Sequence, residues 1–338
     1  MKKRIAIIGA SGYSGAELLK ILLRHPQVTV SAVFANASAG KRVDELYPSF
    51  RAQSDLVYET YSPERTADAD LVFIALPSGE AMKYVPQLLD AGRRVIDLGG
   101  DFRLQDASLY TKYYKHDHLA ADYLPQAVYG LPEWNAAAIA SAQLIANPGC
   151  YVTSALLPLL PLLKEGLIQP NGITISSLSG VSGAGRSSSV DLSFTEVNES
   201  VKAYKVGVHQ HTPEIETVLH TFGGVPSTVT FVPHLIPITR GIYSTIVVQP
   251  ATAVTSERIA DVYAAHYASA PFVRTIGAAV PEIKHVQQTN YCDIGWKVYE
   301  RNGQIILHSV IDNLVKGAAG QAVQNMNLMF GFDETTAL

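Results

Sequence analysis

The stretch that decides the fold is Arg4-Ile5-Ala6-Ile7-Ile8-Gly9-Ala10-Ser11-Gly12-Tyr13-Ser14-Gly15, followed by Ala16-Glu17-Leu18-Leu19-Lys20-Ile21-Leu22-Leu23-Arg24. A short apolar run that ends in a glycine-rich turn before a leucine-rich segment predicts strand, turn and helix. Pro26 cannot continue the helix, and Val28–Phe34 is rich in β-branched residues, so a second strand is expected there. The order of these elements predicts a βαβ unit.

Two further apolar runs, Leu71–Leu76 and Arg94–Leu98, are followed by Pro77-Ser78-Gly79 and Gly99-Gly100. Strands that alternate with helices are typical of doubly wound parallel sheets, in which ligands bind at the carboxyl ends of the strands. We therefore expect an α/β fold with a Rossmann-type doubly wound sheet in the first half of the chain. Pro77 and Ser78 are expected to contact a cofactor.

The glycine loop carries the first chemical signal. Glycines ahead of a helix let backbone N–H groups approach a pyrophosphate, whose negative charge the helix dipole favours. The spacing is GxxGxxG rather than GxGxxG, so a tight turn that only packs helix on sheet stays an alternative. The cofactor-binding residues expected in this loop are Gly9, Ser11, Gly12, Tyr13, Ser14 and Gly15.

The segment after the second strand favours NADP over NAD. No acidic residue follows Val28–Phe34 to bind the 2′-hydroxyl of the adenosine ribose. Ser38, Lys41 and Arg42 offer a hydroxyl and two cations instead, which suit a 2′-phosphate. An exposed basic loop without a ligand is the alternative.

Cys150 is expected to be a nucleophile. It follows Asn147-Pro148-Gly149 and opens an apolar, helix-forming segment that runs to Leu163. The N-terminus of a helix stabilises thiolate over thiol, and the thiolate is the reactive form. Cys292 has strand-like neighbours and is expected to be a small buried hydrophobe.

The segment Gly207-Val208-His209-Gln210-His211-Thr212-Pro213-Glu214 offers a proton carrier for such a cysteine. His211 is the preferred carrier because it lies nearer to Glu214, whose carboxylate would fix its tautomer, and His209 would then bind or orient substrate. If the segment is extended, the two histidines face opposite sides. The two histidines could also be a pair of metal ligands, but the chain offers no further Cys or His cluster to complete a zinc site, so no metal is expected. A surface turn with no role in catalysis is the other alternative.

Arginines and small-residue loops are expected to bind anions. The loop Ser179–Ser189 would let backbone amides approach such a group, and its Ser182 and Gly183 are placed among the cofactor-binding residues. A guanidinium presents a planar fork to phosphate or carboxylate, although a single arginine is more often a solvated surface group. The expected substrate-binding residues are Arg103, Arg186, Arg240 and Asn147.

Length and composition bound the remaining possibilities. The 338 residues favour two domains, and 47% hydrophobic against 17% charged residues favours packed cores. A net charge of −4 argues against nucleic-acid or membrane partners. Two cysteines make no disulfide framework, and the longest apolar stretches are too short or interrupted for a signal peptide or a membrane span, so a soluble cytoplasmic protein is expected.

Taken together, the motifs resemble those of the N-acetyl-gamma-glutamyl-phosphate reductase family, which acts in arginine biosynthesis with NADPH. The wider group includes aspartate-semialdehyde dehydrogenase, which is similar in plan. The resemblance covers nearly the whole chain and rests on the glycine loop, Asp97–Leu104, Tyr129–Glu133, Asn147–Thr153, Ser179–Arg186, His209–Ile215, Pro233–Pro237 and Asp312–Gly320. Gly99-Gly100, in place of a more usual Ser-Ala pair, and Ser154 and Pro158 depart from the pattern of that family.

The resemblance implies a Rossmann domain of residues 1–149 and 313–338 and a catalytic and dimerisation domain of residues 150–312 with a mixed sheet. A C-terminal helix returns to the first domain, and Asn313 lies near the nicotinamide. Cys150 attacks the acyl phosphate, phosphate leaves, and NADPH reduces the resulting thioester to the aldehyde. A homodimer or homotetramer is also implied. Open alternatives are the same chemistry on another acyl phosphate, a non-catalytic NADP-binding regulator and a Cys-His hydrolase.

Overall fold

The computed structural model describes residues 1–186 and 189–338. The chain forms two compact units, one of Met1–Pro148 with Ala318–Leu338 and the other of Gly149–Gly317. The first unit was expected to end at residue 149 and to resume at 313; it ends at 148 and resumes at 318. In the described part of the chain, no helix combines the length and the apolar character that crossing a membrane requires.

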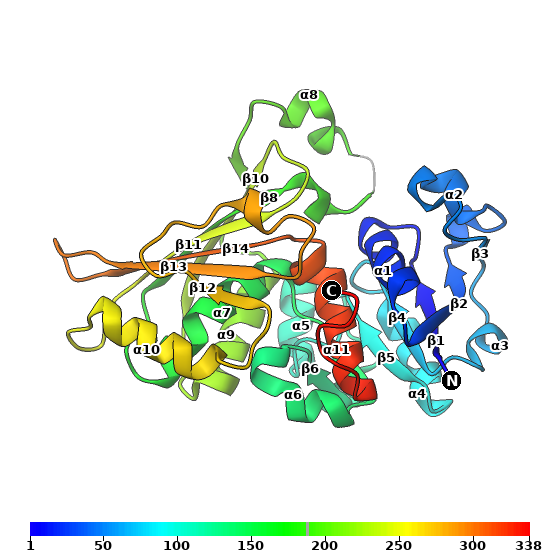
Figure 1. Ribbon diagram of the computed structural model, residues 1–338, viewed down its shortest axis with the longest axis horizontal. Coiled ribbons are helices and arrows are strands. Elements are labelled where there is room, and N and C mark those ends of the chain that lie inside the picture. The colour runs from blue at the N-terminus through cyan, green and yellow to red at the C-terminus, as the bar shows by residue number, and fades with distance from the viewer. Residues whose placement is uncertain (187–188) are drawn as a thin grey trace. The chain divides into compact units, whose positions relative to one another are not determined.

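The first unit is built on a parallel sheet with strands in the order β3-β2-β1-β4-β5-β7-β6 (Figure 1). The strands are β1 (Lys3–Ile8), β2 (Val28–Phe34), β3 (Tyr58–Glu59), β4 (Leu71–Ile74), β5 (Arg94–Asp97), β6 (Ala127–Tyr129) and β7 (Leu144–Ala146). The helices are α1 (Tyr13–Arg24), α2 (Val43–Leu46), α3 (Pro63–Thr66), α4 (Val85–Asp90), α5 (Ala107–Tyr114), α6 (Pro132–Ser141) and α11 (Gly320–Phe330).

Strand order reverses at β1, which pairs with β2 on one side and with β4 on the other. The run Ile5–Ile8 is fully apolar and buried because helices cover both faces of such a sheet. In doubly wound sheets, the ligand crevice lies outside the carboxyl ends of the strands where the order reverses. The loops after β1 and β4 therefore border the expected cofactor crevice, and the expected Rossmann-type fold is confirmed.

The last helix of the chain packs within the first unit. The apolar stripe on α11 and the turn before it includes Ala319, Ala322, Val323 and Met326, which lie in the same core as α1. Helix α11 contacts both α1 and α6. The expected return of the C-terminal helix to the Rossmann domain is confirmed.

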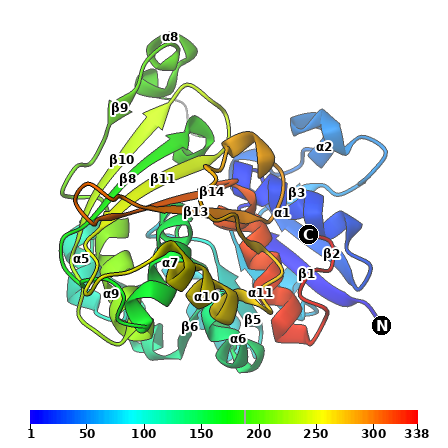
Figure 2. The ribbon, with the colours of Figure 1, turned by 60° about the vertical axis from the view of Figure 1, so that its left-hand side comes forward.

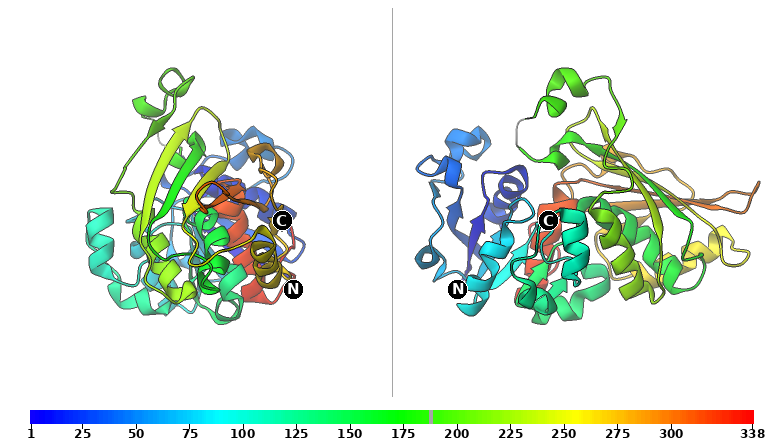
Figure 3. Two further views of the ribbon diagram at one scale, coloured as in Figure 1. Left: turned by 90° about the vertical axis from the view of Figure 1, so that its left-hand side faces the viewer. Right: turned by 180° about the vertical axis from the view of Figure 1, so that it is seen from behind.

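The second unit carries a mixed sheet with strands in the order β12-β13-β14-β11-β8-β10-β9. Figures 2 and 3 show α7, α9 and α10 along one face of this sheet. The strands are β8 (Ile173–Gly180), β9 (Lys202–Ala203), β10 (Val229–Ile236), β11 (Ile242–Val248), β12 (Val273–Thr275), β13 (Cys292–Val298) and β14 (Ile305–Ile311). The helices are α7 (Cys150–Lys164), α8 (Phe194–Val197), α9 (His211–Gly223) and α10 (Ser256–Tyr267).

Helix α7 continues through two prolines that depart from the usual helix pattern, Pro158 and Pro161. A proline has no N–H, so Pro161 cannot bond the carbonyl of Leu157 four residues earlier. The hydroxyl of Tyr267 donates to that carbonyl over 2.5 Å, and Tyr263 donates to the carbonyl of Pro158 over 2.7 Å. Tyrosines of α10 thus satisfy backbone groups of α7, which stays one helix from Cys150 to Lys164.

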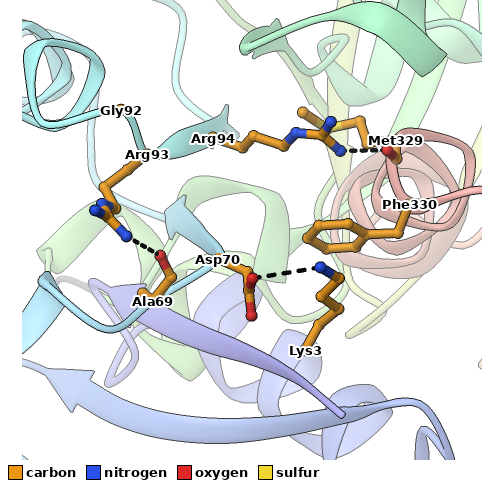
Figure 4. A pocket seen from close by; sticks show the side chains of 8 residues that line it. All are labelled: Lys3, Ala69, Asp70, Gly92, Arg93, Arg94, Met329 and Phe330. Carbon is orange, nitrogen blue, oxygen red and sulfur yellow. Dashed lines mark hydrogen bonds and ion pairs between the residues drawn. The ribbon is translucent and has the colours of Figure 1, made fainter. Parts of the chain in front are cut away.

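A shallow groove of about 380 Å³ lies at the amino ends of β1, β4 and β5, opposite the edge that carries the glycine loop (Figure 4). Its cations are engaged by the chain itself. Arg94 donates to the carbonyl of Met329, and Lys3 pairs with Asp70 and lies over the ring of Phe330. Arg94 and Lys3 thus lie at the C-terminal end of α11, where cations complement the helix dipole.

Candidate active site

Cys150 is the first residue of α7, and Gly149 is its N-cap. The cap has no side chain to bond the first amides of the helix, and Cys150 is partly exposed. The positive end of the helix dipole therefore acts at the thiol. This placement matches the loop-to-helix setting expected for the nucleophile, whereas Cys292 is fully buried and contacts the hydroxyl of Ser309 at 3.3 Å.

His211 and Glu214 both act on the residue before the cysteine. His211 opens α9, and a Cβ added to Gly149 would overlap its Nε2 atom, so the ring lies directly against the Gly149 backbone. Glu214, one turn further along α9 and fully buried, accepts a hydrogen bond from the Gly149 N–H over 2.9 Å. The carboxylate thus holds the backbone that leads into Cys150, a role that sequence spacing did not indicate.

His209 lies in an aromatic enclosure. The rings of Tyr151, Tyr204, Phe231 and His211 surround it, with centroids 4.7–5.8 Å from its own. Burial lowers the pKa of His209 to about 3, so the ring is neutral. Its Nδ1 accepts a hydrogen bond from the backbone N–H of His211 over 3.0 Å. The two histidines pack together at the start of a helix rather than on opposite sides of an extended segment.

A π-helical turn, Val315–Ala319, closes over the cysteine. A Cβ on Gly317 would lie 2.8 Å from the Cβ of Cys150, so only a glycine fits there without displacing the nucleophile. Asp312 anchors the turn by accepting hydrogen bonds from the N–H groups of Leu314 and Val315. The sequence motif that contains both residues, Asp312–Gly320, did not indicate a role for Gly317 or Asp312.

The structure brings together the three cofactor-binding residues expected in the second unit. Asn313 donates from Nδ2 to the hydroxyl of Ser182 over 3.0 Å and accepts from the N–H of Gly241 over 2.8 Å. Gly183 lies beside this amide, since a Cβ there would be 3.6 Å from Nδ2 of Asn313. Asn313 and Ser182 are buried, so one hydrogen-bonded group fixes the loop after β8.

The two expected anion-binding arginines of the second unit differ in their surroundings. Arg240 pairs with the buried Asp312 over 3.2 Å, which ties it to the turn above Cys150. Arg186 is exposed at the end of the small-residue loop, and Ser187 and Ser188 of that loop lie outside the described residues. Over residues 1–186 and 189–338, His, Cys, Asp and Glu side chains form no group of three or more suited to hold a metal.

The glycine loop of the first unit depends on close backbone packing that only glycine permits. Gly9 has a φ of +86°, and a Cβ there would overlap the carbonyl of Ala75. A Cβ on Gly15 would overlap the carbonyl of Gly9, so these two glycines permit close packing. Gly12 caps α1, and a Cβ there would meet only the Gly9 carbonyl, at 3.6 Å. The first turn of α1, with Tyr13 and Ser14, has no side-chain cap; its amides fit an anion.

The loop expected to bind a 2′-phosphate lies after β2. Ser38 is buried at the end of a short 3₁₀ helix, and Lys41 is exposed. Arg42 pairs with Asp44 over 2.9 Å and with Asp55 over 3.1 Å, and these bonds raise its pKa. A phosphate would have to compete with two carboxylates for Arg42, whereas Ser38 and Lys41 have no such pairing among the described contacts.

The remaining expected residues lie at the carboxyl ends of β4, β5 and β7. Ser78 accepts a hydrogen bond from the N–H of Gly100 over 3.2 Å, and Pro77 precedes it in the same loop. Arg103 donates from Nε to the carbonyl of Asn147 over 2.8 Å. Asn147 is fully buried, and its Oδ1 accepts from Asn325 of α11. The side chain of Asn147 therefore fixes the backbone that leads into Cys150 by its hydrogen bond with Asn325.

Comparisons with known proteins agree with this arrangement. The profile described as "Semialdehyde dehydrogenase, NAD binding domain" matches residues 4–142, and "Semialdehyde dehydrogenase, dimerisation domain" matches residues 150–313. Proteins named N-acetyl-gamma-glutamyl-phosphate reductase from Citrifermentans bemidjiense and Geobacter sulfurreducens are 50% and 51% identical over 338 residues, which cover 99% of this chain and 97% of each relative.

Solved structures share the fold at low identity. Aspartate semialdehyde dehydrogenase II of Vibrio cholerae, complexed with ASA, has a TM-score of 0.76 at 18% identity. The aspartate semialdehyde dehydrogenase of Candida albicans, solved with NADP, has a TM-score of 0.73 at 17% identity. Each match covers 98% of this chain and 99% of the other. By its full-length identity to the named relatives, the chain belongs to the N-acetyl-gamma-glutamyl-phosphate reductase family.

Proposed function

We propose that this protein reduces N-acetyl-gamma-glutamyl phosphate to N-acetylglutamate 5-semialdehyde with NADPH, as a step of arginine biosynthesis. The observation that carries the proposal is the setting of Cys150 in a chain about half identical to reductases of that name along its whole length. Cys150 begins a helix, and His211 lies against the preceding Gly149. A nucleophile and a proton carrier that meet at the backbone of Gly149 suit acyl transfer.

The first step is a substitution at the acyl carbon. The thiolate of Cys150 attacks the carbonyl carbon, the bond to the phosphate oxygen breaks, and phosphate leaves with the electron pair. The product is a thioester on Cys150. The α7 N-terminus stabilises the thiolate before the attack. Glu214 holds the Gly149 backbone in place while the carbon–sulfur bond forms.

The second step releases the aldehyde. NADPH, when bound, would supply the hydride that reduces the thioester carbon, and His211 would give the proton that the former carbonyl oxygen takes up, which leaves a thiohemiacetal on Cys150. His211 takes the proton from its hydroxyl group as the carbon–sulfur bond breaks, which returns Cys150 as thiolate. His209 is proposed to bind or orient substrate and also to position His211, because its Nδ1 accepts a hydrogen bond from the His211 N–H.

The cofactor assignment is supported by the glycine loop. An uncapped helix of twelve residues, two glycines in tight contact and an open position at Gly12 form a surface that fits a pyrophosphate. Pro77, Ser78, Ser182, Gly183 and Asn313 are the further residues proposed to hold it. Ser38 and Lys41 favour the 2′-phosphate of NADP, with Arg42 as a weaker contributor because of its two carboxylate partners.

Arg103, Arg186, Arg240 and Asn147 are proposed to form the substrate side of the site. A bound substrate would compete with the bonds that these groups already make, since Arg103 donates to the Asn147 carbonyl and Arg240 pairs with Asp312. We also propose a homodimer or homotetramer, supported by the match to a dimerisation domain. A reducing cytoplasm suits two free cysteines, one of them a nucleophile.

The reaction run in reverse tests the proposal most directly. Purified protein is mixed with N-acetylglutamate semialdehyde, NADP and phosphate, and NADPH is followed by its absorbance. We expect turnover that needs all three components, with arsenate able to replace phosphate. Aspartate semialdehyde and an N-blocked aminoadipate semialdehyde serve as competing substrates, because a difference of one methylene changes kcat/KM by only about 10–200-fold.

The other readings make different predictions in the same assay. A regulator would bind NADP tightly without turnover, and a Cys-His hydrolase would release acid from an acyl substrate without cofactor. Higher kcat/KM with another semialdehyde would keep the chemistry and replace the substrate. Each of these results would overturn the proposed activity in a distinguishable way.

A further inference from the structure

We propose that Asp101 is a positioning residue for the cofactor, because its carboxylate holds the loop after β4 in one conformation. The inference rests on the proposed binding of NADPH. Asp101 follows β5 and is fully buried. The loop that it holds, Pro77–Met82, includes the proposed cofactor residues Pro77 and Ser78 and leads into the short helix Ala81–Lys83.

Four donors converge on the Asp101 carboxylate. Oδ1 accepts from the N–H of Gly79 over 2.6 Å and from the hydroxyl of Tyr110 over 2.8 Å. Oδ2 accepts from the N–H groups of Ala81 over 2.9 Å and Met82 over 3.4 Å. Both oxygens act only as acceptors, so the ionised form is the one that satisfies all four bonds. Hydrogen bonds to a carboxylate are stronger than those between neutral groups.

The loop on which Asp101 acts is a wall of the cofactor crevice. β1 and β4 are the neighbouring strands where strand order reverses, and the glycine loop follows β1. Gly9 of that loop contacts the carbonyl of Ala75, at the start of the loop after β4. Asp101 thus fixes one wall relative to the other through the backbone of Gly79–Met82. A dinucleotide in this crevice would lie against both walls.

The Asp101 segment is itself held in place. His118 bonds the carbonyl of Asp101 through Nε2 over 2.7 Å, and Tyr110 stacks on Tyr114. A Cβ on Gly100 would overlap the hydroxyl of Tyr114, so the glycine that departs from the family pattern makes room for this tyrosine. Because His118 fixes the backbone of Asp101, we expect the loop Pro77–Met82, and not Asp101, to move when its bonds to the carboxylate are lost.

The decisive variant is Asp101→Asn. The amide keeps one acceptor oxygen but turns an N–H₂ group toward donors, so at least two of the four bonds are lost. We expect the Kd of NADPH, measured by quenching of protein fluorescence, to rise at least about tenfold. The KM of NADPH should rise in parallel, whereas kcat at saturating NADPH and the KM of the acyl phosphate should change less than about threefold, as for lost cofactor positioning.

A second readout does not depend on cofactor or activity. Hydrogen exchange of the backbone amides of Gly79, Ala81 and Met82 in the free protein should accelerate in Asp101→Asn, since each donates to Asp101 in the wild type. Amides of β4 should keep their exchange rates. If the wild type fails to bind NADPH while these amides respond as expected, the proposed function fails and the anchoring role of Asp101 stands.

Two further variants serve as controls. Asp106→Asn changes an exposed carboxylate that caps α5 and does not contact the loop, so it should leave the Kd of NADPH unchanged. Tyr110→Phe removes one of the four donors and is expected to raise the Kd about threefold. Unchanged Kd and exchange rates in Asp101→Asn would overturn the proposal. If that variant does not fold, unchanged values in Tyr110→Phe would overturn it.

Discussion

Two helices of this protein begin in nearly the same way and differ in what surrounds them. Both α1 and α7 follow a parallel strand, and both have a glycine N-cap, Gly12 and Gly149, which offers no side chain to bond the first amides of the helix. Their backbones are alike, with φ and ψ of −77° and 168° at Gly12 and −66° and 146° at Gly149. A Cβ added to Gly12 would meet only the Gly9 carbonyl, at 3.6 Å, whereas a Cβ added to Gly149 would overlap the ring of His211.

The difference lies in what the helix dipole is used for. At α1 a Cβ on the cap residue would meet nothing nearer than the Gly9 carbonyl, at 3.6 Å, which leaves room beside the cap for the proposed phosphate. At α7 the first turn is enclosed by His211, Glu214 and Gly317, and the residue that receives the dipole is a thiol of the chain. An open helix start suits a ligand, and an enclosed one suits a nucleophile that must be held in place.

The largest expected effect tests the enclosed turn. Cys150→Ser should lower kcat at least about 10⁴-fold, as removal of a covalent nucleophile does, while the Kd of NADPH stays within twofold of the wild type. Iodoacetamide should label Cys150 far faster than Cys292, which is fully buried. Mass spectrometry of the labelled peptides distinguishes the two. Rapid labelling of Cys292, or residual turnover near the wild-type rate, would contradict the assignment.

The two histidines sharpen the same turn. His211→Asn should lower kcat by about 10²–10⁴-fold and remove a limb of the pH profile, because the proton carrier is lost. His209→Asn should lower kcat less than His211→Asn and leave that limb in place, because the pKa of His209 is lowered to about 3 and its Nδ1 accepts from the His211 N–H. The pH dependence of kcat decides between them. A large loss confined to His209→Asn would exchange the roles.

Much of this comparison is visible in the sequence, because each helix start is encoded locally. The apolar run Ile5–Ile8, the glycines after it and the leucine-rich segment Ala16–Arg24 predict β1, the loop and α1. The order Asn147-Pro148-Gly149-Cys150 likewise predicts a loop that becomes a helix. Residues that are neighbours in the chain need no tertiary structure to be interpreted together.

The enclosure of Cys150 was not predictable, because its parts come from distant segments. Glu214 lies 65 residues from the Gly149 N–H that it holds, and Gly317 returns to Cys150 after 167 residues. Spacing predicted that Glu214 orients His211, which stays a prediction, and it did not indicate the bond from the Gly149 N–H to Glu214. The contacts that let α7 continue through Pro158 and Pro161 were not predictable either, since the tyrosine hydroxyls that bond its backbone belong to α10. Single-sequence reasoning does not detect such long-range partners.

A matched pair of substitutions tests the contrast itself. Ala is compatible with the backbone at both Gly12 and Gly149, so any difference arises from the surroundings. Gly149→Ala should lower kcat at least about 100-fold, because the new methyl group displaces His211, and a misplacement of about 1 Å has this cost. Gly12→Ala should leave kcat within about threefold and raise only the KM of NADPH. Steady-state kinetics measure both. Equal losses of kcat would remove the contrast.

The open turn is sharpened by the cofactor preference. Ser38→Asp places a carboxylate where a 2′-phosphate is expected, so kcat/KM with NADPH should fall relative to NADH by a factor equivalent to about 1–3 kcal/mol. Arg42→Ala is the companion variant and should change the ratio less, since Arg42 is already paired with Asp44 and Asp55. The ratio of kcat/KM values for the two cofactors is the measurement. A wild type that uses NADH equally well would contradict the NADP assignment.

The smallest expected effect is a pH dependence of stability, and it concerns the strands that precede the two helices, β1 before α1 and β7 before α7. Beside the end of β1 lie apolar residues of β2 and β4, whereas β7 pairs with β5 at Asp97, whose carbonyl accepts from the Asn147 N–H. Burial, and next the charge of Asp101, raise the pKa of Asp97 to about 7. The folded protein therefore keeps a proton on Asp97 that the unfolded chain releases near pH 4, and stability falls as pH rises between those values.

That dependence gives a test through the difference between wild type and Asp97→Asn, which cannot titrate. Between pH 6 and 7 the wild type should lose about 1 kcal/mol of stability relative to the variant, or about 1–2 °C in Tm for a chain of 338 residues. Above about pH 8 the difference should be constant, because Asp97 is then ionised in both the folded and the unfolded chain. Differential scanning fluorimetry at half-unit intervals of pH measures it, and Asp106→Asn, at an exposed position, should show no such change. Parallel Tm curves for wild type and Asp97→Asn from pH 5 to 8 would mean that Asp97 is ionised throughout. The backbone of Asn147, whose N–H donates to the Asp97 main-chain carbonyl, would then lie beside a buried negative charge.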